Sequence, residues 1–126
     1  MERLGKFVKT LSKSKIAKIY QKGFESCENI STPINPVWAK NVFWLFTIIL
    51  SQKYKISRNQ LINELKSHGI DSRPMFPTVH SQPIYNTSDN LPVAQKISNY
   101  GISLPSSQSL KKSELNQIIS IIKKFN

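Results

Sequence analysis

Hydrophobic residues recur at mostly three- and four-residue spacings along the first part of the chain. They are Leu4, Phe7, Val8, Leu11, Ile16, Ile19 and Tyr20. This spacing predicts one long amphipathic helix from Glu2 to about Phe24, ~30 Å in length. A single slip between Leu11 and Ile16 widens the apolar stripe. A stripe of this length stays exposed unless further polypeptide covers it.

The next hydrophobic segment is nearly continuous and predicts a buried strand over residues 42–50. It is less than half of the ~20 residues that a membrane-spanning helix needs, so we expect no membrane segment. Before it, residues 26–41 contain Asn29, Pro33 and Pro36, which are typical of a connector.

A second helix is predicted from Ser57 because both of its ends carry signals. Ser57 and Gln60 have the spacing of a capping box, in which each side chain accepts a hydrogen bond from the other residue's backbone N–H. Leu61 and Leu65 supply an apolar face. Gly69 then stands where a residue of left-handed conformation ends a helix.

The chain after Gly69 is rich in proline and polar residues. Pro74, Pro77 and Pro83 favour extended backbone and reduce the entropy lost when the segment orders against a ligand or a partner chain. Short strands are predicted at residues 72–76 and near Val79. The segment therefore has the character of a binding edge.

Two further helices are predicted at residues 92–100 and 112–124. Pro92 suits the first turn of one, Gly101 ends it, and residues 102–105 form a brief extended piece. The last helix is apolar on one face, with Leu115, Ile118, Ile119, Ile122 and Phe125. The alternation of helices and strands predicts an α/β fold.

Length and cysteine content fit a single domain that folds without disulfides. The chain has 126 residues and one cysteine, Cys27, which we interpret as a small apolar residue. No segment has the layout of a signal peptide, so we expect a cytoplasmic protein.

The formal net charge of +11 raises the question of a nucleic-acid partner. Of the 18 basic residues, 15 are lysines spread along the chain, and arginine, the usual reader of base edges and phosphates, stands at three positions only. The densest basic cluster lies on the first predicted helix. We favour a solvated helix face there and keep a small basic nucleic-acid-binding module as an alternative.

The sequence offers no metal site and no catalytic centre of its own. The two histidines, His68 and His80, are 12 residues apart, and no Cys-x-x-Cys pair exists. None of the four glycines neighbours another, so a phosphate-cradling loop is absent. The acidic residues are scattered singly, which leaves no carboxylate pair for acid–base catalysis.

Three later segments resemble the C-terminal end of the DegT/StrS-type sugar-nucleotide aminotransferases, which use pyridoxal phosphate. The segments are RNQLINELKSHGIDSRPMFPTVHSQPIYN, LPVAQKISNYGISLPSS and LKKSELNQIISIIKKF. The front segment, ERLGKFVKTLSKSKIAKIYQKGF, is similar to the long helix that leads out of that family's large cofactor domain. The resemblance divides the chain into residues 1–25, the long helix from the end of a missing large domain, and residues 26–126, a C-terminal small domain.

This resemblance implies the small domain of the fold-type-I transferases, an α+β unit with a short, mostly antiparallel sheet packed with helices. The Arg-Pro-x-Phe form of residues 73–76 resembles the branch that acts on nucleotide-linked 4-keto-6-deoxy sugars, perosamine synthases among them. The complete enzyme would move an amino group from an amino acid, with glutamate expected, to a nucleotide-linked keto-sugar in surface polysaccharide biosynthesis.

The Schiff-base lysine of this family belongs to a glycine-rich segment of the large domain, which this sequence lacks. We therefore expect pyridoxal phosphate in the complete enzyme, not covalently bound by this chain, and no amino transfer by the chain alone. The expected partners are a homodimer mate or a separately encoded large domain. In the second case, a split aminotransferase, the two halves would reassemble on the apolar stripe of the first helix.

The resemblance places the proline-rich segment near the sugar or nucleotide of the substrate. It implies substrate-binding roles for Arg73 on a phosphate, for His80 and Gln82 on sugar hydroxyls, and for Tyr85 on a ring. No residue of the chain is assigned a catalytic role.

Each of these residues also has a structural alternative. Arg73 can pair with Asp71, and His80 can stabilise its own loop. Phe76 and Tyr85 can belong to the core, which is the usual place of aromatic residues. Trp38 and Trp44 we assign to packing.

Overall fold

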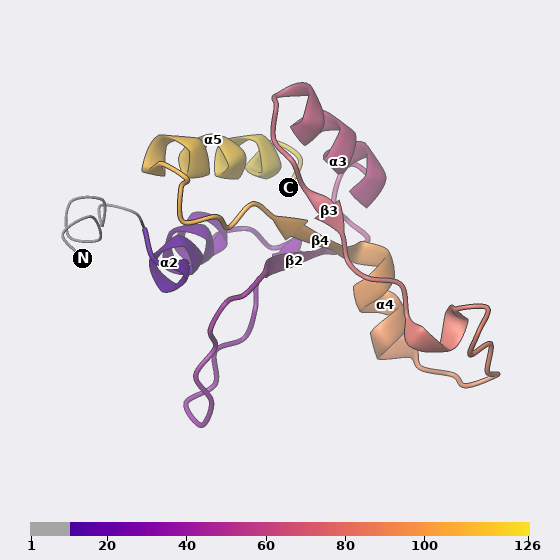
Figure 1. Ribbon diagram of the computed structural model, residues 1–126. Coiled ribbons are helices and arrows are strands. Elements are labelled where there is room, and N and C mark those ends of the chain that lie inside the picture. Colours follow the sequence, from indigo (N-terminus) through magenta and orange to yellow (C-terminus); the bar gives the residue numbers. More distant parts are fainter. Residues whose placement is uncertain (1–10) are drawn as a thin grey trace.

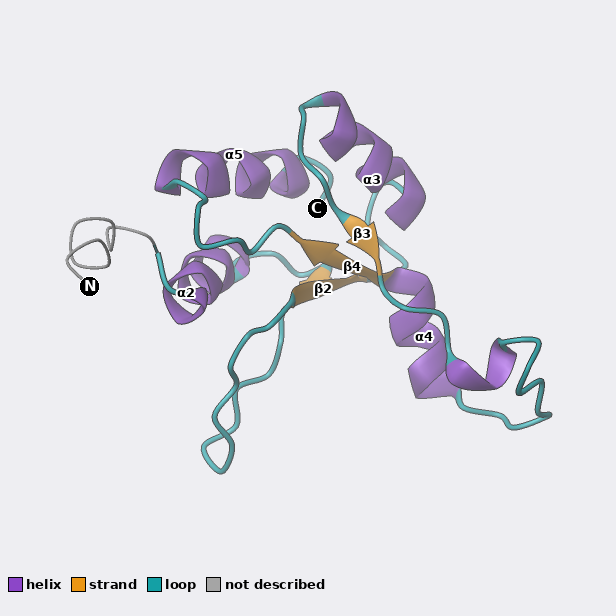
Figure 2. Cartoon of the chain, in the orientation of Figure 1, coloured by secondary structure: helices purple, strands orange, loops and turns teal. Residues whose placement is uncertain are grey.

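The structure is a computed structural model that describes residues 11–126. Its helices are α2 (Lys13–Phe24), α3 (Arg58–Ser67), α4 (Pro92–Tyr100) and α5 (Lys112–Lys123), with a short 3₁₀ helix, η1 (Val79–Ser81). Its strands are β1 (Ile30–Ser31), β2 (Phe46–Leu50), β3 (Arg73–Pro74) and β4 (Gly101–Leu104). Figures 1 and 2 show the helices packed around a small central sheet.

The strands form one antiparallel sheet in the order β1-β2-β4-β3. Phe46 of β2 stands opposite Leu104 of β4, and Ile48 stands opposite Ile102. All four of these side chains are buried, so the two central strands line the core. The predicted α/β class and mostly antiparallel sheet are confirmed.

The core lies between the sheet and the helices α2, α3 and α5. Alternate residues of β2 are buried, and the ring of Phe46 stacks on Tyr20 of α2 with centroids 4.9 Å apart. Helix α2 packs tightly on α5, because a Cβ at Gly23 would lie 2.7 Å from Ile119 Cδ1. Helix α4 has no buried residue and contacts β2 and β4 at the other end of the molecule (Figure 1).

Among the described residues, helix α2 begins at Lys13, inside the apolar stripe that predicted one helix from Glu2 to about Phe24. Ser12 has an extended backbone and caps α2, because its Oγ accepts a hydrogen bond from the Lys15 N–H at 3.2 Å. A continuous helix through Ser12 is therefore wrong, and the slip between Leu11 and Ile16 marks this start. The predicted part over residues 1–10 lies outside the described residues. The stripe that follows is buried, through Ile16, Tyr20 and Phe24.

The predicted strand at residues 42–50 is also shorter in the structure. Phe43 has a φ of +50°, in the left-handed region, and its N–H donates to Asn41 Oδ1 at 2.8 Å. This turn interrupts extended backbone, so β2 begins only at Phe46. Within the predicted connector, β1 was missed, and the strand predicted near Val79 is the 3₁₀ helix η1.

The predicted ends of α3 are confirmed in detail. Ser57 Oγ accepts from the Gln60 N–H at 3.2 Å, and Gln60 Oε1 accepts from the Ser57 N–H at 2.8 Å. Gly69 has a φ of +75°. The N–H of Gly69 reaches the Lys66 carbonyl and that of Ile70 reaches the Leu65 carbonyl, which together make a Schellman motif.

Candidate functional site

Two segments project from the packed body of the protein. We call residues 32–45 the loop and residues 75–91 the arm; both extend away from the sheet in Figures 1 and 2. They carry most of the exposed large hydrophobic residues of the described chain, namely Ile34, Val37, Trp38, Val42 and Trp44 on the loop and Phe76, Val79, Ile84, Tyr85 and Leu91 on the arm. The surface of both segments is therefore suited to contact with something else.

Four aromatic residues on these segments lie outside the core, whereas Phe43 of the loop is buried in it. Trp38 is 87% exposed and Trp44 is 69% exposed, so their assignment to packing is wrong. Phe76 and Tyr85 are 59% and 57% exposed, so a core role is wrong for them too. The physical reason is the same in each case, since both segments leave the packed body. By contrast, Cys27 is buried as expected.

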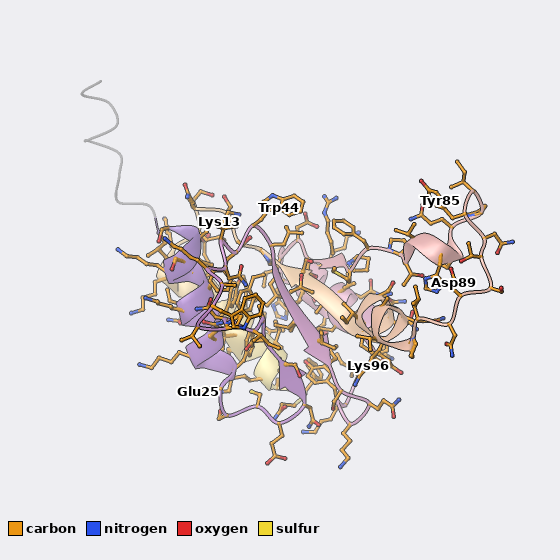
Figure 3. The ribbon with its side chains drawn as sticks, turned by 90° about the horizontal axis from the view of Figure 1, so that it is seen from below. Lys13, Glu25, Trp44, Tyr85, Asp89 and Lys96 are labelled. Carbon is orange, nitrogen blue, oxygen red and sulfur yellow. The ribbon has the colours of Figure 1, made fainter. Side chains whose placement is uncertain are left out.

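The base of the loop is fixed to the body by a lysine. Lys13 Nζ donates to the Trp44 carbonyl at 3.2 Å and to Ser106 Oγ at 3.3 Å. Figure 3 shows Lys13 and Trp44 on the same side of the molecule. The Lys13 ammonium therefore connects α2 with the loop and with the segment that follows β4.

A groove of about 600 Å³ lies where the arm leaves β3 and passes α4. Among its lining residues are Arg58, Arg73, Phe76, Thr78, Gln95 and Asn99. Two contacts hold its walls together: Arg58 Nη1 donates to the Ser98 carbonyl, and Ser98 Oγ donates to the Phe76 carbonyl at 2.9 Å. The first turn of α3, the last turn of α4 and the start of the arm therefore form one braced unit.

The structure does not bring the four predicted substrate-binding residues together. Arg73 lies on β3 and lines the groove, with Nη2 3.5 Å from Asp71 Oδ2. His80 is half-buried in η1 and Gln82 is its C-cap, while Tyr85 lies near the far end of the arm, as Figure 3 shows. These three residues do not line the groove. Their substrate roles stay predictions.

The sequence reading missed part of the groove. In the sequence, Arg58 is recognisable only as the first residue of a helix. That it lines the same groove as Arg73 depends on how α3 packs against β3. Gln95 and Asn99 had a weak local signal, because residues four apart share one face of a helix. No spacing in the sequence links α4 to Arg73.

Two tyrosine hydroxyls are buried away from the groove. Tyr20 donates to the Pro105 carbonyl at 2.6 Å and Tyr54 to the Ile122 carbonyl at 2.7 Å. Burial raises the pKa of both phenols above their usual range, and for Tyr54 the nearby Cys27 thiol adds to the effect. Both groups stay protonated and act as structural ties.

The lysines of residues 11–126 do not fit an anchor for pyridoxal phosphate. A lysine becomes nucleophilic when it is desolvated or placed beside another cation. All described lysines except Lys13 are exposed, and Lys13, half-buried, is engaged with Trp44 and Ser106. Among these residues, no cluster of three or more acidic, histidine or cysteine side chains could hold a metal ion. No described helix is long and apolar enough to cross a membrane.

Comparison with known proteins shows what the chain is similar to. GDP-perosamine synthase from Vibrio cholerae is 30% identical over 132 residues, covering 99% of this chain and 34% of that protein. GDP-perosamine synthase from Caulobacter vibrioides is 28% identical over 95 residues, covering 74% of this chain and 26% of that protein. The aminotransferase TlmJ from Streptoalloteichus hindustanus superposes with a TM-score of 0.79 at 19% identity, covering 98% of this chain and 32% of that one.

These relatives are longer than the chain, which spans about a third of their length or less. The family model of the DegT/DnrJ/EryC1/StrS aminotransferases matches residues 1–123. Because this match extends over almost the whole sequence, the chain belongs to the DegT/DnrJ/EryC1/StrS aminotransferase family.

Proposed function

We propose that this chain is the small domain of an enzyme that transfers an amino group to a nucleotide-linked keto-sugar. The donor is an amino acid, with glutamate expected, and the product serves surface polysaccharide biosynthesis. The observation that carries the proposal is the 30% identity to GDP-perosamine synthase over 99% of the chain. The antiparallel sheet with its covering helices supports it, because the fold agrees with solved aminotransferases.

In this proposal the chain binds and orients the sugar nucleotide. Arg73 binds a phosphate, and the arm brings His80, Gln82 and Tyr85 over the sugar, since all four side chains are exposed or half-buried. Members of the family in general depend on pyridoxal phosphate. The described lysines do not fit its anchor, so the cofactor chemistry belongs to polypeptide other than residues 11–126.

A domain graft tests the proposal. The matched residues of the Vibrio cholerae enzyme are replaced by this chain, and amino transfer from glutamate to a GDP-linked 4-keto-6-deoxy sugar is followed by release of 2-oxoglutarate. We expect the graft to transfer the amino group, and the same enzyme without the matched residues to be inactive. A folded graft that binds pyridoxal phosphate but aminates no nucleotide-linked keto-sugar would contradict the proposal.

A split aminotransferase is the second candidate, and the exposed loop favours it. The apolar stripe of α2 cannot be the docking surface, because Ile16, Tyr20 and Phe24 are buried within the chain itself. In a split enzyme, the separate cofactor domain would instead dock on the loop and the arm, where the apolar side chains are exposed. Retention of a cofactor-domain polypeptide by this immobilised chain, together with amino transfer by the mixture, is the expected result.

A further inference from the structure

A cavity of about 500 Å³ lies where the turn after β2 meets α4. Its volume is within the ~300–1,000 Å³ range of small-molecule sites. Three segments line it: residues 28–29, residues 50–53 and, on α4, Lys96 and Tyr100. It shares no lining residue with the groove between β3 and α4, and Figure 3 shows Lys96 well apart from Tyr85 on the arm. The cavity is therefore separate from the predicted substrate-binding residues.

Hydrogen bonds fix the wall that the turn contributes to this cavity. Ser51 Oγ donates to Asn29 Oδ1 at 2.8 Å, and the Ser51 N–H donates to the Asn29 carbonyl at 2.9 Å. The Lys53 N–H donates to Ser51 Oγ at 3.1 Å, and the Asn29 N–H donates to Asn126 Oδ1 at 3.0 Å. The backbone that carries Glu28 and Lys53 is therefore held in place before a ligand arrives, which lowers the entropy that binding costs.

Three charged side chains line the cavity, two of them positive and one negative. They are Lys53 on the turn, Lys96 on α4 and Glu28. All three are exposed, and none forms an ion pair with another described residue. Charges that share a cavity without contacting one another can each take a counter-charge from a ligand. The matching ligand carries two negative charges and one positive charge.

We infer that this cavity binds an α-amino acid with two carboxylates, such as glutamate. Its carboxylates pair with Lys53 and Lys96, and its ammonium pairs with Glu28. Its methylene groups pack on the half-buried ring of Tyr100. Because the cavity is separate from the predicted substrate-binding residues, the amino acid is an effector there and not the amino donor. The site therefore does not depend on the proposed function.

Titration of the purified, isotope-labelled chain, followed by its amide NMR signals, tests the site with L-glutamate, glutarate and L-glutamine at constant ionic strength. Because exposed side chains make the contacts, we expect a dissociation constant for L-glutamate on the order of 1 mM. Glutarate lacks the ammonium and L-glutamine lacks the second carboxylate, so each should bind about threefold or more weakly. The signals that shift should belong to residues 28–29, 51–53 and 96–100.

Two variants test the charges of the cavity separately. Lys96→Gln weakens L-glutamate binding about threefold or more. The matched control Lys18→Gln, which removes the same charge from the exposed face of α2, changes the affinity less than about 1.5-fold. Glu28→Gln removes the preference for L-glutamate over glutarate, because the ammonium contact is lost. Glutarate then binds as tightly as before or more tightly, since one negative charge is gone.

Three results would overturn the site. They are binding of L-glutamate no tighter than that of glutarate, equal weakening by Lys96→Gln and Lys18→Gln, or shifted signals that lie outside the cavity. Circular dichroism of each variant verifies that the fold is intact.

The grafted enzyme separates the effector site from the proposed function. Lys96→Gln in the graft should leave the KM for glutamate unchanged, and a raised KM would overturn the effector role. A graft that transfers no amino group leaves L-glutamate binding by the chain standing. A chain that does not bind L-glutamate leaves amino transfer by the graft standing.

Discussion

Tyr20 and Tyr54 each connect distant segments of the protein through one buried hydrogen bond. Each phenol is buried and donates to a carbonyl distant in sequence, at 2.6 Å for Tyr20 and 2.7 Å for Tyr54. Because the pKa of each is raised in the folded chain, the protonated form belongs to the fold. The contribution to stability is complete below the ordinary phenol pKa near 10 and is lost as the pH rises above it.

Replacing Tyr20 by phenylalanine tests this tie. Removal of the hydroxyl leaves the Pro105 carbonyl without that donor, so we expect the free energy of unfolding to fall by about 1–2 kcal/mol in urea titrations near neutral pH. Above pH ~10 the variant loses stability less steeply than the native chain, because one raised pKa is gone. Tyr100→Phe, at a half-buried tyrosine, is the control and should change little. A variant as alkali-sensitive as the native chain would contradict this role.

Gly101 is required where α4 passes into β4. A Cβ at this position would lie 2.5 Å from the Ile97 carbonyl oxygen and 2.8 Å from Met75 Cβ. Gly101→Ala therefore forces the backbone apart, and we expect a loss of about 1–3 kcal/mol in urea unfolding. Gly69→Asn is a fitting comparison, since Gly69 has open space around it and asparagine tolerates a positive φ. An equal loss in the two variants would show that the close approach at Gly101 carries no cost of its own.

At the scale of elements, the capping box of α3 connects local stability with the groove. Ser57→Ala removes the acceptor of the Gln60 N–H, which costs about 1 kcal/mol for a typical cap. Arg58 stands in the next position and lines the groove, so a frayed first turn also loosens its contact with Ser98. We expect lower stability in urea unfolding, together with faster amide hydrogen exchange in the last turn of α4, where Arg58 contacts the Ser98 carbonyl. Ser57→Asp, which keeps a capping acceptor, should restore both, and exchange in α4 that is unaffected by Ser57→Ala would show that the cap does not support the groove.

The elements that the sequence predicted well have local signals at their ends. Helix α3 has its capping box and Gly69, and α4 has Pro92 at its first turn. Strand β1 has no such signal, because two residues become a strand only by pairing with β2. The start of α2 was missed for a related reason: Ser12 stands within an apolar stripe, and its capping role depends on an extended backbone.

In the candidate site, too, the residues with a local sequence signal could be predicted and those placed by tertiary packing could not. Arg73 and the proline-rich segment were predictable, since both belong to one continuous stretch of sequence. Arg58, Gln95 and Asn99 were not, because they reach the groove through the packing of α3 and α4 on the sheet. The exposure of Trp38 and Trp44 could not be predicted from the sequence either, since residue type alone favours the interior for aromatic side chains.

At the scale of the whole molecule, the body buries its apolar side chains in a core of its own, whereas the loop leaves most of its apolar side chains exposed. The core holds large buried side chains from α2, α3, α5 and the sheet. The loop shows two indoles and three aliphatic side chains to solvent, and Lys40 is the one charged residue in residues 32–45. In a chain with a formal net charge of +11, such a surface is suited to a protein partner more than to a nucleic acid.

Trp38 and Trp44 are the only tryptophans of the chain, so its fluorescence reports on the loop alone. In the isolated chain we expect emission at long wavelength that changes little on unfolding in urea, because both indoles are already exposed. The double variant Trp38→Ser, Trp44→Ser should keep the free energy of unfolding, followed by circular dichroism, within about 0.5 kcal/mol. Ile48→Ala, at a fully buried core position, should lose about 2–5 kcal/mol.

The same double variant separates folding from assembly with the cofactor domain that the split-enzyme proposal requires. If the loop is the docking surface, association shifts the native emission to shorter wavelength, and loss of both indoles weakens binding about tenfold or more, because interface tryptophans carry much of the binding energy. The variant would then be as stable as the native chain and yet unable to complete an active enzyme. Association that survives the loss of both indoles would place the contact on the arm instead, where Ile84 and Tyr85 are the next side chains to replace.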